Sequence, residues 1–112
     1  MSEPPLELSA TAAAATLRAS EPRPLLLDCR TAEEHATARI PSAVLIPMQE
    51  LAGRVAELEA WRDRPIIVHC HHGVRSLRVA TWLRTRGFTL VQSMAGGIDA
   101  WSTEVDPSVP RY

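Results

Sequence analysis

The sequence contains no lysine, since all 12 of its basic side chains are arginine, set against 13 acidic ones. Schiff-base catalysis on lysine is therefore excluded, and the formal net charge of -1 argues against a general nucleic-acid binder. Two cysteines are too few for a disulfide scaffold, so both are expected to be free thiols. No apolar run approaches membrane-spanning length and the first residues lack a signal-peptide pattern, so we expect a cytoplasmic protein with no membrane partner.

Acidic residues are also missing from one long stretch of the chain. No Asp or Glu lies between Asp63 and Asp99, and the basic residues in this stretch are Arg64, Arg75, Arg78, Arg84 and Arg86. Such an excess produces a local positive field that would attract a small anion. Alternatively, Arg84 and Arg86 only complement the C-terminus of a helix, which leaves Arg75 and Arg78 for a site.

The length of 112 residues, with 46% hydrophobic side chains, predicts one globular domain over residues 1–112. Short apolar runs alternate with segments of helical spacing. The runs predict strands at 6–8, 25–27, 43–46, 66–68 and 89–91, and the spacing predicts helices over 10–19, 33–35, 50–61, 76–86 and 98–101. This alternation predicts an α/β fold, with a mostly parallel five-stranded sheet and helices on both faces.

The most informative stretch is the loop that follows the fourth predicted strand. Cys70 lies where that strand ends, and a predicted helix begins near Ser76. The first amides of a helix have no intrahelical acceptor, so a loop from His71 to Arg75 that curls around the sulfur would stabilise a thiolate. Gly73 permits a positive φ, and Arg75 adds a planar cation for an oxyanion. We therefore expect Cys70 to be a nucleophile with a low pKa.

Two other kinds of site use residues similar to those of this loop. Cysteine phosphatases and arsenate reductases also use a loop of amides that ends in arginine, but they need five residues between the two, and here there are four. A metal site made from His69, Cys70, His71 and His72 is disfavoured because contiguous residues do not readily converge on one ion. His69 precedes the loop on the strand, so it should point away from Cys70 as a packed core histidine.

Four segments together resemble the single-domain rhodaneses of the thiosulfate sulfurtransferase type, and they extend over nearly the whole chain. Residues 70–76, Cys-His-His-Gly-Val-Arg-Ser, resemble C-x-x-G-x-R-S, and residues 28–30, Asp-Cys-Arg, resemble D-V-R. Residues 34–43 resemble E-[FY]-x-x-G-H-I-P-G-A, with Ala38, Arg39 and Ser42 as departures, and residues 95–101 resemble A-G-G-I-x-A-W. The departures lie away from the nucleophile. The resemblance implies a rhodanese-like fold.

The resemblance also implies a mechanism. Thiolate Cys70 would be the catalytic residue, taking the outer sulfur of thiosulfate or a related anionic donor as a persulfide. A thiophilic acceptor, which is cyanide, a thiol or a protein, would then remove it, and no metal or organic cofactor is required. Arg75, with His71 or His72, would engage the sulfonate end of the donor. The substrate-binding residues implied in this way are His71, His72, Gly73, Val74, Arg75 and Ser76.

Two alternatives stay open at this point. Cys29 takes the place of the usual valine, and we interpret it as a small buried hydrophobe rather than a second redox thiol. Some rhodanese-like domains are non-enzymatic binding modules or sulfur carriers. Such modules often lack the cysteine, whereas this loop keeps Cys70, Gly73 and Arg75 together. The retained residues favour a role in sulfur transfer.

Overall fold

The computed structural model describes residues 3–19 and 21–112, and a five-stranded sheet forms its centre. The strand order is β1-β5-β4-β2-β3 and every strand pair is parallel, which confirms the predicted α/β class. Continuous apolar strands suit this arrangement because both faces of the sheet are covered. The strands are β1 (Glu7–Leu8), β2 (Leu25–Asp28), β3 (Val44–Leu45), β4 (Ile66–His69) and β5 (Val91–Met94).

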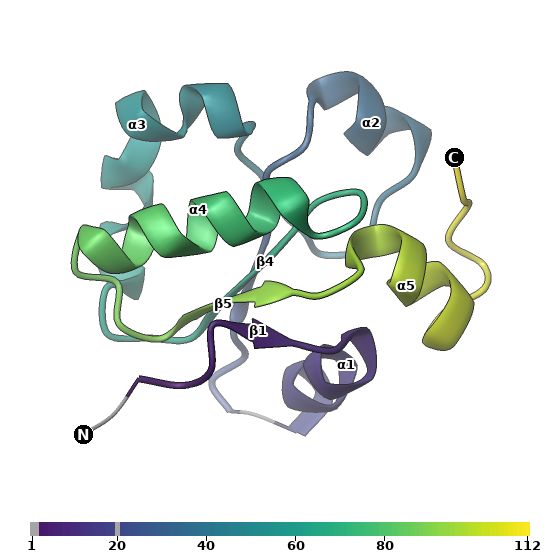
Figure 1. Cartoon of the computed structure of the whole chain (residues 1–112), viewed down its shortest axis with the longest axis horizontal. Helices are drawn as coiled ribbons and strands as arrows, with labels where there is room; N and C mark the ends of the chain where they lie inside the picture. The colour runs from purple at the N-terminus through teal and green to yellow at the C-terminus, as the bar shows by residue number, and fades with distance from the viewer. Residues whose placement is uncertain (1–2, 20) are drawn as a thin grey trace.

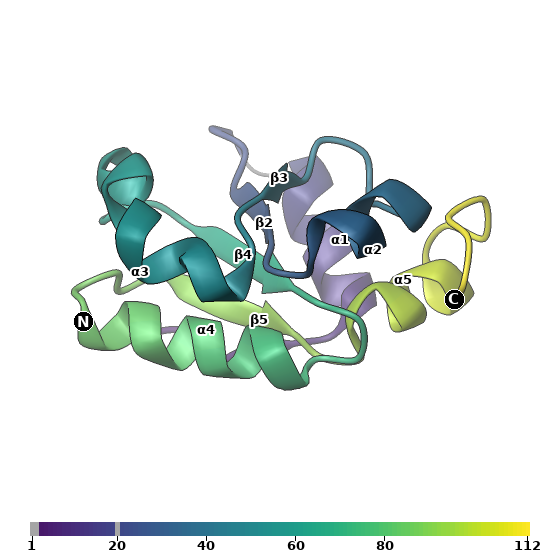
Figure 2. The same ribbon diagram turned by 90° about the horizontal axis from the view of Figure 1, so that it is seen from above.

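Helices cover the two faces of the sheet in separate groups (Figure 1). One face packs against α1 (Ala10–Ala19) and α5 (Gly97–Glu104), and the other against α3 (Leu51–Arg54), the 3-10 helix η2 (Val55–Trp61) and α4 (Val74–Thr85). A short 3-10 helix, η1 (Met48–Glu50), precedes α3, and α2 (Ala32–Thr37) has no buried residue. The strands β4 and β5 point toward the end of the molecule where α2 and α5 lie (Figure 2).

Several predicted elements were wrong in extent. The single helix expected over 50–61 is interrupted, because α3 ends at Arg54 and a 3-10 helix follows. Gly53 destabilises an α-helix at this point. Leu51 and Leu58 are both buried, and their spacing is compatible with an α-helix as well as with a 3-10 helix. The helix after Cys70 begins at Val74 rather than near Ser76. The last strand is Val91–Met94 rather than 89–91. Its polar residues, Gln92 and Ser93, interrupt the apolar run on which the prediction was based.

The capping signals were read correctly. Thr31 caps α2 and forms a capping box with Glu34, whose carboxylate accepts from the Thr31 amide at 3.2 Å. Gly87 follows α4 with a φ of +96°, as expected of a glycine after a helix C-terminus. Ser9 accepts from the Ala12 amide at 3.1 Å at the start of α1. Local hydrogen-bonding chemistry therefore sets several of the helix ends in this chain.

Candidate active site

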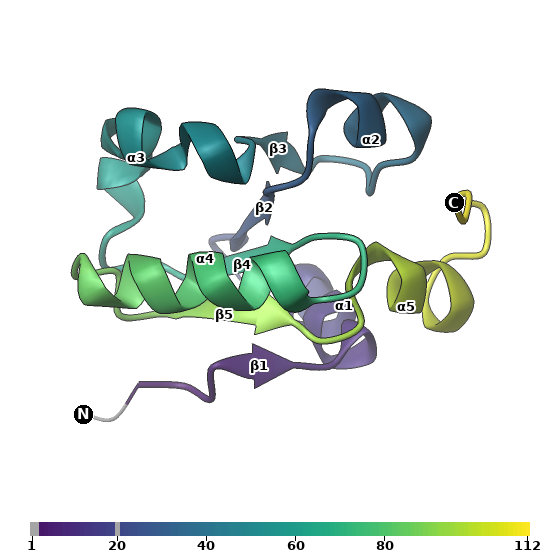
Figure 3. The ribbon, with the colours of Figure 1, turned by 45° about the horizontal axis from the view of Figure 1, so that its top comes forward.

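The loop between β4 and α4 lies at the carboxyl edge of the sheet, beside the beginning of α5 (Figure 3). Gly73 precedes α4 with a φ of +102°, and a Cβ at this position would lie 3.1 Å from the Gly96 nitrogen. A glycine is therefore needed there on both conformational and steric grounds. Because α4 begins at Val74, Ser76 is its third residue, and its amide has no partner within the helix.

Two backbone amides hold the Cys70 sulfur, and they come from the two sides of this helix start. The Gly73 amide donates to Sγ at 3.1 Å and the Ser76 amide at 3.3 Å. Within residues 3–19 and 21–112 no other backbone amide donates to this sulfur, so the nest is smaller than the full loop that the sequence predicted. The positive end of α4 adds to the stabilisation of a negative sulfur.

The pKa of the Cys70 thiol is lowered to about 4. The largest cause is hydrogen bonding with the thiol of Cys29, and burial acts in the opposite direction. The Ser76 hydroxyl and the amides of Ser76 and Gly73 complete the lowering. Cys70 is therefore a thiolate at neutral pH although it is only 1% exposed, which makes it a nucleophile protected by its surroundings.

A serine on the neighbouring strand orients the Ser76 hydroxyl. Ser76 Oγ lies 3.5 Å from Cys70 Sγ and 2.7 Å from Ser93 Oγ on β5, and both serines are buried. When Cys70 is a thiolate, Ser76 donates to the sulfur and must accept from Ser93. Sequence reasoning missed Ser93 because it lies in the part of β5 that an apolar pattern does not reveal. The signal available was its position in a strand next to the loop.

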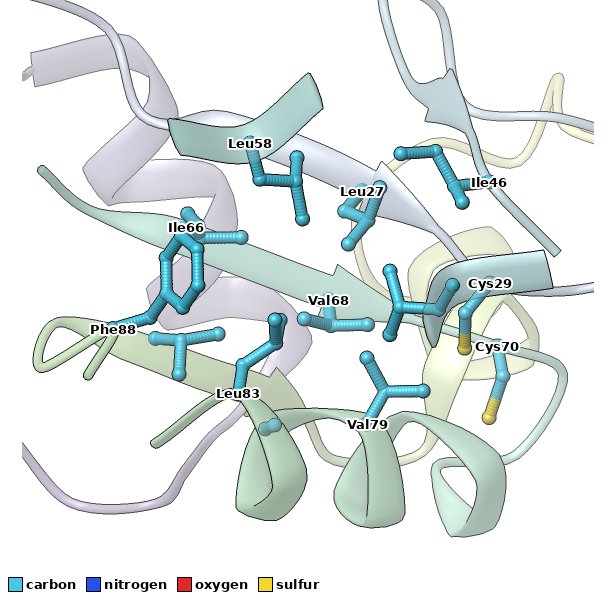
Figure 4. Packing of buried hydrophobic residues seen from close by; sticks show 13 residues of the cluster. Leu27, Cys29, Ile46, Leu58, Ile66, Val68, Cys70, Val79, Leu83 and Phe88 are labelled. Carbon is cyan, nitrogen blue, oxygen red and sulfur yellow. The ribbon is translucent and has the colours of Figure 1, made fainter. Parts of the chain in front are cut away.

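Cys29 is as buried as Cys70, at 1% exposure, and its sulfur lies beside the Cys70 sulfur (Figure 4). Its thiol also lies 3.5 Å from the His69 carbonyl oxygen. The nearby Cys70 sulfur and burial raise the pKa of Cys29, so this residue stays a thiol. The interpretation of Cys29 as a buried residue is confirmed, but the side chain also contacts the nucleophile, which the sequence did not indicate.

Arg75 points its planar group at a carboxylate within this structure. It donates to Glu34 Oε1 at 2.6 Å and to Oε2 at 2.9 Å, and both side chains are partly exposed. This pair and a hydrogen bond from Tyr112 lower the pKa of Glu34. The cation that the sequence placed at the site is thus present beside the loop, paired with an acid from α2.

The segment Asp28-Cys29-Arg30 contributes a buried ion pair under the loop. Arg30 donates to the Asp28 carboxylate at 2.9 and 2.8 Å, and both side chains are fully buried. Arg30 also donates to the Tyr112 hydroxyl at 2.9 Å. His69 is fully buried, with Nε2 4.0 Å from the Asp28 carboxylate, and burial lowers its pKa. His69 is therefore a neutral core histidine, as predicted.

The two loop histidines lie at the rim. The His71 ring stacks on His72 at 3.9 Å and on Tyr112 at 4.0 Å between centroids, and its Nε2 lies 3.0 Å from the Tyr112 carbonyl oxygen. Val74, which sequence reasoning assigned to substrate binding, is 66% exposed at the start of α4. Tyr112 is a residue that sequence reasoning missed, because nothing local marks a residue whose contacts are all distant in sequence.

Hydrogen bonds from the start of α5 hold the backbone of the loop that follows β4. The Ile98 amide donates to the Cys70 carbonyl at 2.8 Å and the Asp99 amide to the His71 carbonyl at 3.2 Å. A Cβ on Gly97 would lie 2.5 Å from both carbonyl oxygens. The small residues before Ile98 therefore allow the helix to approach the backbone of the loop.

The far arginines of α4 do not reach the site. Arg84 donates to the carbonyl oxygens of Val91 and Pro4, and Arg86 lies over the Trp82 ring. Arg84 lies in the last turn of α4 and Arg86 directly follows the helix, at the end opposite Cys70. Across the part of the chain that the structure describes, no three His, Cys, Asp or Glu side chains converge as a metal site requires, and no helix is long and apolar enough to cross a membrane.

A parallel α/β domain that presents a cysteine thiolate between a strand and a helix N-terminus is a design shared by a known class of proteins. The family model described as Rhodanese-like domain matches residues 9–104, and the chain belongs to this family. This confirms the resemblance drawn from the four sequence segments.

Curated relatives and solved structures agree with this assignment. The chain is 35% identical over 85 residues to a protein named Sulfurtransferase from Allochromatium vinosum, covering 76% of this chain and 78% of that one. It is 32% identical over 87 residues to Thiosulfate sulfurtransferase GlpE of Pseudoalteromonas translucida, covering 78% and 81%. It spans only 30% of Rhodanese-like/PpiC domain-containing protein 12 of Arabidopsis thaliana, at 34% identity. The crystal structure of a rhodanese-like domain protein from Staphylococcus aureus matches 95% of this chain and 97% of its own, with a TM-score of 0.75 and 28% identity.

Proposed function

We propose that this protein is a sulfurtransferase that carries sulfane sulfur on Cys70. The single observation that supports this most is the Cys70 sulfur held by the Gly73 and Ser76 amides at the start of α4. Such a site stabilises a sulfur anion both before and after it gains a second sulfur. The names of the Allochromatium and Pseudoalteromonas relatives agree with this role.

The reaction uses a small anionic donor, for which thiosulfate is the first candidate. The Cys70 thiolate attacks the outer sulfur, the bond between the two donor sulfurs breaks, and sulfite leaves with the electron pair. The product is a Cys70 persulfide anion. Arg75 engages the sulfonate end of the donor, with His71 or His72 at the rim, and the reaction balances without a metal ion or organic cofactor.

The second half-reaction passes the outer sulfur to a thiophilic acceptor. Cyanide serves as an acceptor in the test tube, and a thiol or a protein thiol is the acceptor proposed in a cell. The rim formed by His71, His72 and the exposed Val74 gives such an acceptor access to the loop. Nucleic acid and membranes are not proposed as partners.

Intact-protein mass spectrometry after incubation with thiosulfate tests the proposal. Soon after mixing, we expect a gain of one sulfur atom, which cyanide or a dithiol removes and which Cys70→Ser does not acquire. Fast turnover with thiosulfate and cyanide identifies an enzyme, whereas loading by other sulfane donors with slow thiosulfate turnover identifies a sulfur carrier. If no sulfane donor changes the mass of the chain, the proposal is contradicted, and a binding module would then be the better assignment.

A further inference from the structure

A second thiol, that of Cys29, lies beside Cys70, and the proposed transfer reaction does not use it. In the β2–β4 ladder Asp28 is the Cα partner of His69, so Cys29 and Cys70 are the next residues on the two strands. The Cys29 amide donates to the His69 carbonyl at 3.1 Å, which extends the ladder to this position. Neighbouring strands lie about 4.8 Å apart, and disulfides join Cα atoms roughly 4.4–6.8 Å apart. The backbone therefore already has the spacing that a disulfide requires.

The side chains also point to the same face of the sheet. Leu27 and Val68 are register partners two residues earlier, and both belong to the same core cluster as the two cysteines. Because side chains alternate along a strand, Cys29 and Cys70 follow Leu27 and Val68 on that face. The close-up shows the two sulfur atoms next to each other at the ends of β2 and β4 (Figure 4).

We propose that Cys29 is a resolving thiol, which converts the Cys70 persulfide into a Cys29–Cys70 disulfide and releases hydrosulfide. This inference rests on the proposed function, because that reaction supplies the persulfide. The Cys29 sulfur attacks Cys70 Sγ, and the bond between Sγ and the outer sulfur breaks. The outer sulfur leaves with the electron pair and takes the proton of the Cys29 thiol, so one persulfide anion and one thiol become one disulfide and one HS⁻.

The order of events follows from charge. While Cys70 is a thiolate, the negative sulfur beside Cys29 raises the pKa of that thiol and keeps it protonated. Once Cys70 carries a second sulfur, the negative charge moves to the outer atom and Sγ is uncharged. The Cys29 proton can then pass to the outer sulfur, which leaves a Cys29 thiolate to attack Sγ. An external dithiol, either a small molecule or a dithiol protein, then reduces the disulfide and restores both cysteines. The protein would thus release sulfide at the expense of a dithiol, without a sulfur acceptor.

The test uses the full chain, thiosulfate as donor, no added thiol, and anaerobic conditions so that no peroxide supplies oxidising equivalents. The wild type is expected to end two hydrogens lighter than its reduced form, with a Cys29–Cys70 crosslinked peptide and roughly one sulfide released per chain. Cys29→Val, which carries the valine usual at this position of the resembling motif, is expected to keep the added sulfur and release none. A dithiol should return the wild type to its starting mass.

The outcomes separate the two proposals. A wild type that keeps its added sulfur, with no crosslinked peptide and no sulfide, overturns the resolving role and leaves the transfer function intact. If neither the wild type nor Cys29→Val gains sulfur or forms the disulfide, both proposals fail. The crosslinked peptide is sought in the wild type itself, so the test does not depend on whether the variant folds.

Discussion

At the scale of single residues, the acidity of Cys70 comes from a few donors that overcome burial. Burial alone raises the pKa of a thiol, yet the pKa here is lowered to about 4 by the Cys29 thiol, the Ser76 hydroxyl and two amides. Because a lowered pKa favours the ionised form, the thiolate persists as pH falls through the neutral range and is lost only near pH 4. The nucleophile is therefore ready without a general base.

This acidity predicts a pH titration. The ultraviolet absorbance of the thiolate should fall with a midpoint near pH 4 in the wild type. Cys70→Ser should lack that step, because the thiol that titrates is removed and burial still raises the pKa of Cys29. In Cys29→Val the midpoint should move upward by about one pH unit, since the largest cause of the lowering is gone. A wild-type midpoint near that of an ordinary thiol, about 8.5, would contradict this description of the site.

The Arg75 guanidinium is already paired with the Glu34 carboxylate, so its role in binding the donor needs a separate test. If Arg75 recognises the sulfonate, Arg75→Gln should raise the KM for thiosulfate by about 10- to 100-fold with a smaller effect on kcat, the scale of a lost charge-assisted hydrogen bond. Arg18→Gln, at an exposed position in the last turn of α1 on the other face of the sheet, is the control and should leave KM unchanged.

Glu34→Gln distinguishes recognition from a structural role for the same pair. Removing the carboxylate frees Arg75, so KM should stay equal or fall if the guanidinium binds the donor. If the pair only supports the loop, both Arg75→Gln and Glu34→Gln should raise KM alike. Steady-state kinetics with thiosulfate and cyanide measure all three variants.

The site residues that were predicted from the sequence share one property, which is that the residues next to them in the chain identify their position. Cys70, Gly73 and Arg75 lie within one short segment that runs from the end of β4 through the loop into the start of α4. Ser93 and Tyr112 act through contacts 17 and 78 residues away in sequence, to Ser76 and Glu34. Only the fold brings such residues to the site.

At the scale of elements, α5 determines where the loop can lie. Gly97 has a φ of +58°, and its missing side chain leaves room for the carbonyl oxygens of Cys70 and His71. The amides that follow bond to those two carbonyls, so the start of this helix and the nucleophile loop form one rigid unit. A substitution at the start of α5 should therefore displace the loop that carries Cys70.

Gly97→Ala tests this coupling. A Cβ would lie 2.5 Å from two backbone oxygens and in a left-handed conformation, so we expect a loss of about 2 kcal/mol or more in the free energy of unfolding. Sulfur transfer should fall as well because the loop must shift. Gly53→Ala is the control, since nothing lies within 4 Å of its Cβ position in α3, and it should stabilise by about 0.5–1 kcal/mol. Urea unfolding measures both, and equal effects at the two glycines would contradict the coupling.

The elements were predictable where a local rule governs them. Apolar runs gave the buried strands and capping residues gave helix ends, because these depend on near neighbours. The interrupted helix after Glu50 and the shifted β5 were not predictable, since tertiary packing selects among backbones that satisfy the same pattern. Ser42 is another such case, because it adopts a φ of +71° at the position where the resembling motif has glycine.

At the scale of the whole molecule, Tyr112 joins parts of the site that lie far apart in the sequence. Tyr112 lies against the first half of the chain, where its hydroxyl accepts from Arg30 and donates to Glu34 at 2.7 Å. Its ring covers His71 of the loop. One side chain thus links the buried ion pair under the sheet edge, the acid that holds Arg75, and the rim of the nucleophile loop.

Tyr112→Phe removes the hydroxyl and keeps the ring. Because two hydrogen bonds to charged partners are lost at a partly exposed position, the free energy of unfolding should fall by about 1 kcal/mol. Glu34 also becomes less restrained, so the KM for thiosulfate should change in the same direction as in Glu34→Gln. Arg111→Gln is the control, because its exposed pair with Asp99 should contribute nothing measurable. If Tyr112→Phe, like Arg111→Gln, unfolds at the wild-type midpoint and keeps the wild-type KM, the Tyr112 hydroxyl does not position Glu34. Tyr112 would then only pack against the loop, and it would not connect the buried ion pair to the site.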